Sequence, residues 1–98
     1  MYGTVARMRI KPGAEEELAR LGESLTSADV PAGMVAQYIY RSDADPQEYT
    51  LVAVFASEEV YRANAASPDQ HARYEQWSAH LAADPEWRDG AIVLAYPH

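Results

Sequence analysis

The order of the predicted elements constrains this chain more than any other feature of its sequence. Four segments have the alternation or apolar content typical of strands, and two regions have helical spacing. The strands are expected over residues 2–10, 34–40, 49–56 and 91–96, and the helical regions over 14–27 and 57–83. The order strand–helix–strand–strand–helix–strand is that of the ferredoxin-like split βαβ fold. We therefore expect an α+β fold whose four-stranded antiparallel sheet carries two helices on one face.

Local signals define the first helix and the approach to the last strand. Leu18, Leu21 and Leu25 recur at the three- and four-residue spacing that places them on one apolar stripe. Three glutamates occupy the first helical turn, where the helix dipole favours negative charge. Residues 87–90 are expected to form a turn before the last strand.

The second helical region is broken by its capping residues. Ser57 is a good N-cap for a short helix over residues 58–65. Ser67 is a second N-cap, and Pro68 suits the first position of a longer helix over residues 68–83. The sequence therefore predicts a short helix followed directly by a longer one.

Composition excludes several classes of protein. The 98 residues suffice for one core, so a single domain over residues 1–98 is expected. A formal charge of −7 repels phosphate backbones and anionic membrane surfaces, which argues against nucleic acid or a membrane as a partner. The absence of cysteine removes disulfides and thiolate sites and is consistent with a cytoplasmic location. No apolar run is long enough to span a bilayer.

Two of the predicted strands are apolar on both sides, which indicates a partner. In the third strand, Leu51 and Phe55 share one parity and Val52 and Val54 share the other, and the last strand is apolar on both parities as well. Two helices cover only one face of such a sheet, and soluble monomers rarely expose a large apolar patch. We therefore expect a homodimer formed through the uncovered sheet face. The alternative is that these positions lie under loops at strand ends.

Three segments resemble a known family. The first is Ala6-Arg7-Met8-Arg9-Ile10-Lys11-Pro12-Gly13, a strand that stops before an acidic helix start. The second is Phe55-Ala56-Ser57-Glu58-Glu59-Val60-Tyr61, and the third is Ser67-Pro68-Asp69-Gln70-His71. In order and spacing, nearly the whole chain resembles the antibiotic biosynthesis monooxygenase (ABM) domain of the dimeric α+β barrel superfamily.

The resemblance implies a homodimer with a pocket in each subunit between the sheet and the helices. Some members of that family are cofactor-independent oxygenases of aromatic polyketides, and others degrade haem. The haem-degrading branch places Asn, Trp and His at positions that correspond here to Ala6, Asn64 and Tyr74. None of the three agrees, so haem degradation is disfavoured. The resemblance leaves a monooxygenase acting on a small aromatic or quinone-like substrate, or a non-catalytic ligand-binding or regulatory dimer.

Aromatic residues are the first candidates for substrate binding. They are Tyr38 and Tyr40 on one strand, Phe55 on the next, and Trp77 on the long helix. Such side chains can hold a planar aromatic ligand by stacking. The alternative is that they fill an ordinary core.

Candidate catalytic residues follow from the chemistry of a cofactor-independent oxygenase, which oxidises its substrate as an anion. His71 can act as the base because imidazole titrates near neutrality, while Asn64, Tyr74 or Arg7 can stabilise an oxyanion by hydrogen bonding. The alternatives are a solvent-facing His71, an Asn64 that caps its helix, and an Arg7 that faces the dimer interface.

A metal or a bound cofactor is not expected. His71 and Glu75, like His80 and Asp84, are four residues apart, but two ligands fall short of the three or four that zinc requires. The sequence also has no phosphate loop, dinucleotide fingerprint or nucleophile elbow.

Overall fold

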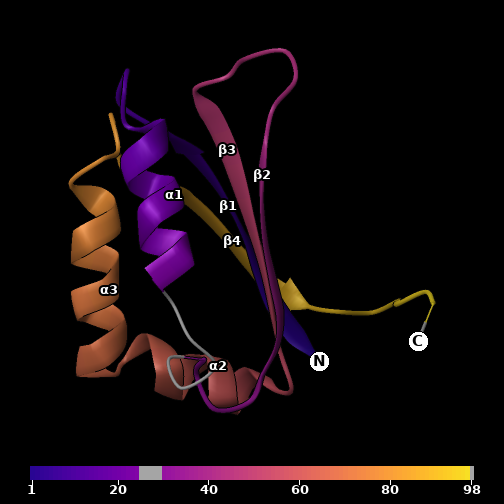
Figure 1. Ribbon diagram of the computed structural model, residues 1–98. Coiled ribbons are helices and arrows are strands. Elements are labelled where there is room, and N and C mark those ends of the chain that lie inside the picture. Colours follow the sequence, from indigo (N-terminus) through magenta and orange to yellow (C-terminus); the bar gives the residue numbers. More distant parts are fainter. Residues whose placement is uncertain (25–29, 98) are drawn as a thin grey trace.

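The sheet has four antiparallel strands in the order β2-β3-β1-β4 (Figure 1). The computed structural model describes residues 1–24 and 30–97. The strands are β1 (Tyr2–Arg9), β2 (Met34–Arg41), β3 (Glu48–Phe55) and β4 (Glu86–Ala91). This order confirms the ferredoxin-like arrangement, since the first and third strands pair at the centre and the second and fourth lie at the edges.

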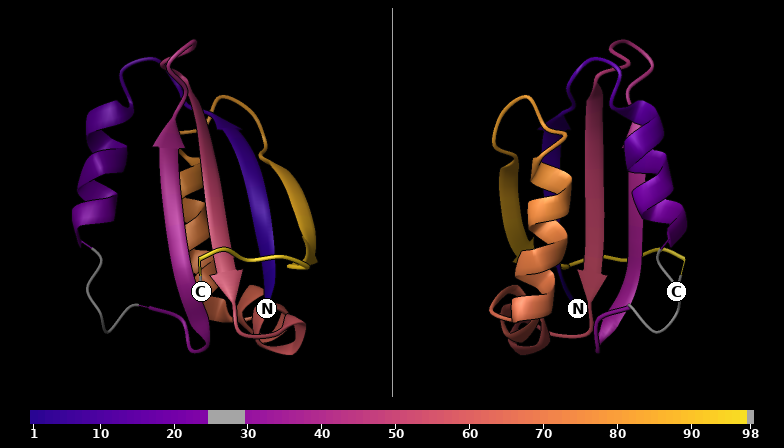
Figure 2. Two further views of the ribbon diagram at one scale, coloured as in Figure 1. Left: turned by 90° about the vertical axis from the view of Figure 1, so that its right-hand side faces the viewer. Right: turned by 60° about the vertical axis from the view of Figure 1, so that its left-hand side comes forward.

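The described residues also form three helices: α1 (Glu15–Ser24), α2 (Glu58–Ala65) and α3 (Pro68–Ser78). Helices α1 and α3 lie on the same side of the sheet, and α2 lies across one end of it (Figures 1 and 2). The predicted break is confirmed, because the Ser57 and Ser67 side chains accept hydrogen bonds from the third residue of α2 and of α3, respectively. Residues 25–27, which the sequence assigned to the first helix, lie outside the described residues.

The core lies between the sheet and the helices. Alternate residues of β1 point into it, as the period of two predicts. The register pairs Tyr2 and Thr4 of this buried set with Phe55 and Ala53, the two buried residues of β3. The buried apolar side chains of this core are Tyr2, Ala6, Met8, Ile10, Ala14, Leu18, Ala53, Phe55 and Leu81.

Helix α3 ends at Ser78, five residues before the predicted end at Ala83. The chain that follows turns back and pairs with the end of β1. Leu81 forms an isolated bridge with Ile10, and the Ala82 N–H donates to the Arg9 carbonyl at 2.7 Å. This pairing buries Leu81, so tertiary contact rather than helix propensity determines where α3 stops.

The last strand lies earlier than predicted, and this is the main correction. Residues 86–91 pair with β1, including the expected turn at 87–90, and Thr4 lies opposite Asp89 in the register. The apolar residues 92–96 lie beyond the sheet, where Val93 and Leu94 are 94% and 85% exposed. An edge strand has one neighbour and open flanks, so it tolerates the charged residues of β4. The part of the dimer argument that placed residues 92–95 in the sheet is therefore wrong.

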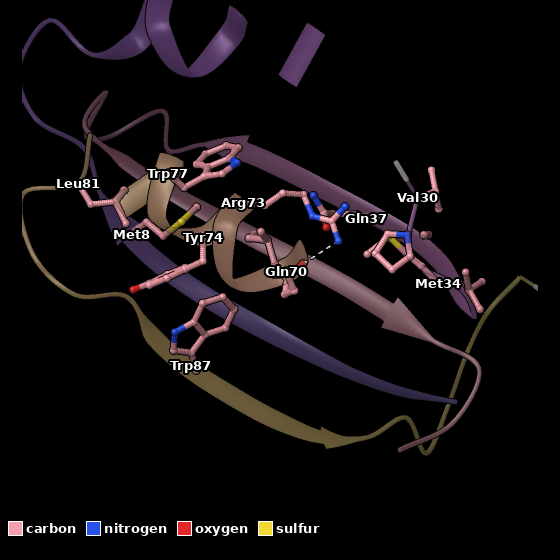
Figure 3. A pocket seen from close by; sticks show the side chains of 14 residues that line it. Met8, Val30, Met34, Gln37, Gln70, Arg73, Tyr74, Trp77, Leu81 and Trp87 are labelled. Carbon is pink, nitrogen blue, oxygen red and sulfur yellow. Dashed lines mark hydrogen bonds between the residues drawn. The ribbon is translucent and has the colours of Figure 1, made fainter. Parts of the chain in front are cut away.

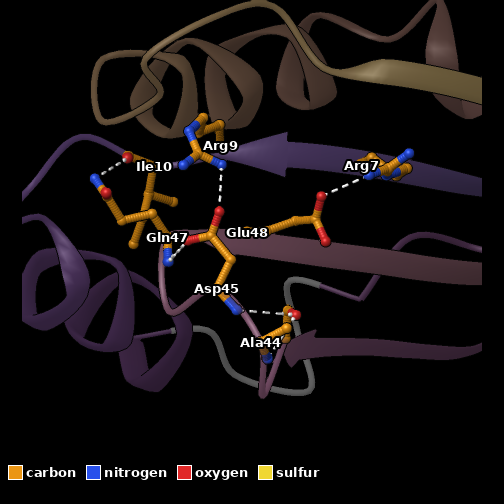
Figure 4. Close-up of polar contacts among 8 residues, drawn as sticks. Arg7, Arg9, Ile10, Ala44, Asp45, Gln47 and Glu48 are labelled. Atoms are coloured by element: carbon orange, nitrogen blue, oxygen red, sulfur yellow. Dashed lines mark hydrogen bonds and ion pairs between the residues drawn. The ribbon is translucent and has the colours of Figure 1, made fainter.

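The second face of the sheet carries no helix in the described residues, and the C-terminal segment stands out from it (Figures 1 and 2). Val5, Tyr38 and Tyr40 are exposed there. Arg7 pairs with Glu48 at 2.6 Å, and Arg9 pairs with Asp45 at 2.7 Å (Figure 4). We call this the uncovered face; it combines apolar side chains with paired charges. No described helix has the length and apolar character needed to cross a membrane.

Candidate functional site

A cavity lies between α3 and the covered face of the sheet (Figure 3). It has two adjoining chambers, which share Leu51, Gln70, Tyr74 and Trp87 among their lining residues. The first, which we call the Trp77 chamber, has a volume of about 410 Å³. The second, the Asp89 chamber, has a volume of about 510 Å³. These volumes fall in the range of small-molecule sites.

Aromatic rings form much of the cavity wall. Tyr74 and Trp77 come from successive turns of α3, and Trp87 reaches the cavity from β4 (Figure 3). The ring centroids of Tyr74 and Trp87 lie 6.3 Å apart with planes tilted by 53°. Trp87 remains 45% exposed, so the wall is not closed by other side chains on that side. Flat apolar surfaces of this kind suit a planar aromatic ligand.

The Trp77 chamber also has hydrogen-bond donors. The Arg73 guanidinium donates to the Gln70 side-chain oxygen at 3.4 Å (Figure 3). Gln37 projects into the same chamber from β2. A fixed positive charge and amide groups at an otherwise apolar wall favour a ligand that carries a carbonyl or an anionic oxygen.

The Asp89 chamber ends in a hydrogen-bonded cluster that joins two strands and a helix. The Thr4 hydroxyl donates to Asp89 Oδ1 at 2.7 Å, and the Tyr61 hydroxyl donates to the same oxygen at 3.0 Å. Arg62 Nη1 lies 4.0 Å from Asp89 Oδ2. Burial, followed by the hydrogen bond to the Asp89 carboxylate, raises the pKa of Tyr61, so the phenol stays protonated and keeps donating.

Five of the predicted site residues meet at this cavity. Phe55, Asn64, His71 and Tyr74 line the Asp89 chamber, and Trp77 lines the other. Phe55 is buried and packs edge-on against the ring of Tyr61, with centroids 5.3 Å apart. Residues from β3, α2 and α3 are therefore brought together.

His71 and Asn64 occupy positions with clear local roles. The His71 side chain is 72% exposed at the cavity rim, with Nε2 2.9 Å from Glu75 Oε1. Asn64 lies inside α2, whose C-cap is Ala66 with a right-handed φ of −87°. The capping explanation for Asn64 is therefore wrong, and its side chain belongs to the chamber lining.

Three predicted residues do not reach the cavity. Tyr38 and Tyr40 lie on the uncovered face, where they are 66% and 58% exposed. Arg7 lies on the same face and pairs with Glu48. A register irregularity near the start of β2 lets Met34 and Gln37 both line the cavity, and the tyrosines follow on the opposite parity. On this face, Arg7 lines neither chamber of the cavity.

The sequence reading missed several cavity residues, above all those on β4. Trp87 and Asp89 alternate with Glu86 and Arg88 at a period of two, which is a weaker strand signal than the more apolar segment that follows. Thr4 and Tyr61 gave no local signal, because their roles depend on the register of β1 with β4 and on the placement of α2.

No group of three or more metal-ligating side chains occurs in the two stretches that the structure describes. His71 and Glu75 do share a helix face, with Nε2 2.9 Å from Glu75 Oε1, but no third ligand joins them among the described residues. The polar groups that line the cavity are amides, hydroxyls, the Asp89 carboxylate, the Arg73 guanidinium and the His71 imidazole.

The fold and the cavity define a ferredoxin-like α+β protein with a small-molecule pocket between sheet and helices. A family model described as antibiotic biosynthesis monooxygenase matches residues 1–77, and the chain belongs to this family. A search of curated proteins found no match.

Solved structures share the fold at low sequence identity. SnoaB, a cofactor-independent oxygenase from Streptomyces nogalater, is 19% identical, with a TM-score of 0.81 over 99% of this chain and 97% of its own. Rv0793 from Mycobacterium tuberculosis is 18% identical, with a TM-score of 0.78 over 97% of both chains. A conserved protein from Methanosarcina mazei Go1 is 19% identical, with a TM-score of 0.79 over 91% of this chain and 89% of its own. At these identities the likeness establishes the fold.

Proposed function

We propose that this protein is a cofactor-independent monooxygenase acting on a small aromatic or quinone-like compound. The observation that carries the proposal is the cavity walled by Tyr74, Trp77 and Trp87 in a chain of the ABM family. The description of SnoaB as a cofactor-independent oxygenase supports the reaction class. The aromatic wall supports a planar substrate, and the donors in the Trp77 chamber support one with a carbonyl oxygen.

The proposed reaction needs no bound electron carrier, because the substrate anion reduces oxygen itself. With an anthrone, a base removes a proton, and the anion reacts with O₂ to form a carbon–oxygen bond at the methylene carbon. The O–O bond then breaks as the remaining hydrogen leaves that carbon as a proton. One oxygen atom becomes the new carbonyl, and the other leaves as water with the two hydrogens. The sum is anthrone plus O₂ giving anthraquinone plus water.

The roles follow the positions of the side chains. His71 is proposed as the base, because it lies at the rim of the Asp89 chamber and Glu75 engages its Nε2. A neutral imidazole that donates from Nε2 keeps Nδ1 as the proton acceptor. Asn64 and Tyr74 are proposed to donate hydrogen bonds to the developing oxyanion. Trp77 and Phe55 are proposed to bind the ring system.

Oxygen uptake tests this proposal. The wild-type protein, treated with a chelator, is expected to accelerate oxygen consumption by anthrone and to release anthraquinone in a one-to-one ratio. His71→Ala and Asn64→Ala are expected to lower the rate about 100-fold, within the range of a lost general base or oxyanion donor. His80→Ala is a matched control, because His80 lies outside both chambers. Unchanged rates in both cavity variants would remove the proposed roles.

A non-catalytic ligand-binding dimer is the second candidate. The observation that favours it is the 72% exposure of His71, since a general base works best where water is excluded. This candidate predicts saturable binding of aromatic compounds with no oxygen consumption above the uncatalysed rate. Calorimetry and the oxygen electrode, used on the same preparation, separate the two functions.

We also propose that the protein works as a homodimer formed through the uncovered face. Tyr38, Tyr40 and Val5 are exposed there, and Leu94 in the protruding C-terminal segment is 85% exposed. Burying these side chains in a second copy would remove them from water. Sedimentation at micromolar concentration is expected to give twice the subunit mass, and a stable single subunit would contradict the proposal.

A further inference from the structure

The Asp89 chamber contains a polar cluster that the proposed reaction does not use. Asp89 lies on β4, and its neighbours come from β1 and α2. Thr4 is 4% exposed, and the Asp89 side chain is 29% exposed. A carboxylate on the inward side of an edge strand is held in place by two hydroxyl groups and faces a chamber otherwise rich in aromatic rings.

The directions of the hydrogen bonds at Asp89 make this carboxylate available to a ligand as a hydrogen-bond acceptor. The Tyr61 proton goes to Asp89 Oδ1, and the Thr4 proton goes to the same oxygen at 2.7 Å, with the Arg88 carbonyl as a more distant acceptor at 3.4 Å. A carboxylate has about four acceptor positions, so these two bonds leave the Asp89 carboxylate with further capacity to accept. Arg62 lies 4.0 Å from Oδ2 and also contacts Tyr2 and Glu58. A ligand that donates a proton is therefore favoured here over one that only accepts.

The charge of Arg62 and the aromatic rings around Asp89 narrow the class of ligand that would donate this hydrogen bond. The positive charge of Arg62 offsets the carboxylate of Asp89, so a cationic donor has less to gain than an uncharged hydroxyl. Phe55, Tyr74 and Trp87 line the same chamber, so the hydroxyl has to belong to a group that packs against aromatic rings.

We propose that Asp89, held by Thr4 and Tyr61, is the subsite that binds an aromatic hydroxyl group of the ligand. This inference rests on the proposed use of the cavity, and it narrows the substrate class to hydroxylated aromatics. Asp89 acts in it as an acceptor that orients the ring. The hydroxyl end of the substrate lies at Asp89, and its carbonyl end lies toward Tyr74, a proposed oxyanion donor that lines both chambers.

A purely structural role for the cluster makes a different prediction. In that case Asp89 only ties β4 to β1 and α2, and its replacement lowers thermal stability without changing ligand preference. The readout therefore has to be a ratio of affinities for two ligands, because a ratio is insensitive to the fraction of folded protein.

Calorimetric titration with 2-naphthol and its methyl ether, 2-methoxynaphthalene, provides that ratio. The two ligands share a ring system, and only the first donates a proton. Wild-type protein is expected to bind the naphthol on the order of 10-fold to 100-fold more tightly, the range of one hydrogen bond to a charged group. Asp89→Asn is expected to bring the ratio close to one. Glu86→Gln removes a carboxylate from the same strand on the opposite parity, and it is expected to keep the wild-type ratio.

Each outcome has a defined meaning. A wild-type ratio near one, binding of neither ligand, or a full ratio in Asp89→Asn would overturn the subsite. Tyr61→Phe is a second variant, and it is expected to lower the ratio partway because Asp89 keeps the Thr4 hydrogen bond. Hydroxyl preference without oxygen uptake removes the monooxygenase proposal and leaves this subsite intact. Oxygen uptake with an unchanged ratio in Asp89→Asn supports the monooxygenase proposal and removes the subsite.

Discussion

The two faces of the sheet differ in what covers them and in how much of their apolar surface is exposed. On the covered face, Phe55 and Ile10 are almost fully buried, and the space left beside α3 is the aromatic-walled cavity. On the uncovered face, Tyr38 and Tyr40 are exposed, and charged residues near the β2–β3 loop neutralise one another. Under the two proposals, the covered face carries the core and the ligand, and the uncovered face carries the contact with a second copy.

The largest expected difference between the faces is in stability. Phe55→Ala empties a fully buried site, and it is expected to lower the free energy of unfolding by about 3–5 kcal/mol at every protein concentration. Tyr40→Ala is expected to change only the part of the stability that depends on protein concentration. Denaturant unfolding at two concentrations measures both. If both variants lost the same free energy of unfolding at both protein concentrations, the uncovered face would not differ from the covered face in contributing to association.

A charge placed on the uncovered face is expected to weaken association. Tyr38→Glu removes an exposed aromatic side chain from the proposed interface and introduces a charge that has to be desolvated. We expect the dimer dissociation constant to rise about 30-fold, the effect of losing one strong interface residue. Gln76→Glu adds the same charge to the exposed side of α3 and is expected to have no effect. Sedimentation velocity distinguishes the two variants.

Removing residues 93–97 tests whether the C-terminal segment belongs to the association surface. Val93, Leu94 and Tyr96 are nearly fully exposed in the single chain and stand clear of the sheet (Figure 1). We expect the dimer dissociation constant to rise about tenfold, which corresponds to the loss of one buried apolar side chain. The cavity lies on the other side of the sheet, so naphthol affinity per subunit is expected to stay the same. A loss of ligand binding would show that the segment also completes the cavity.

The smallest expected effect concerns the ion pair at the hairpin loop. The Arg9 side chain, and then the Gln47 N–H, hold the pKa of Asp45 below its usual value (Figure 4). A lowered folded-state pKa contributes stability above the unfolded value of about 3.9, and this contribution is lost as the pH falls through the folded-state value. Asp45→Asn is therefore expected to be slightly less stable than wild type at pH 7, with the difference disappearing in acid. Thermal unfolding across pH measures this; Asn keeps the oxygen that accepts from the Gln47 N–H, so a difference that persists in acid would show that it does not come from the Asp45 charge.

The fold was predictable from the sequence wherever local chemistry and tertiary structure agree. The parity of β1, the N-caps at Ser57 and Ser67 and the polar loop between β2 and β3 all act within a few residues of each other. The last strand was misplaced because residues 91–96 have the higher strand propensity. The ladder with β1 instead selects residues 86–91, whose inward parity carries Trp87 and Asp89.

The site was predictable only in part, for a related reason. Tyr74 and Trp77 lie on one helix, and their spacing predicts that they share a face of it. Phe55 is an apolar strand residue, and it is buried as such a residue is expected to be. Tyr38 and Tyr40 were grouped with them because strand parity alone does not tell which side the helices cover. The Thr4–Asp89 hydrogen bond joins residues at opposite ends of the chain, so no local pattern foretells it.

The central claim is that the helix-covered cavity, rather than the uncovered face, holds the ligand. The chain has two tryptophans, Trp77 and Trp87, and both line that cavity. Fluorine NMR of protein labelled with 5-fluorotryptophan therefore gives two resonances, both of which report on it. We predict that 2-naphthol shifts both resonances in a saturable way, and that Tyr38→Ala leaves these shifts unchanged. Two resonances that stay unmoved at saturating ligand would contradict the account.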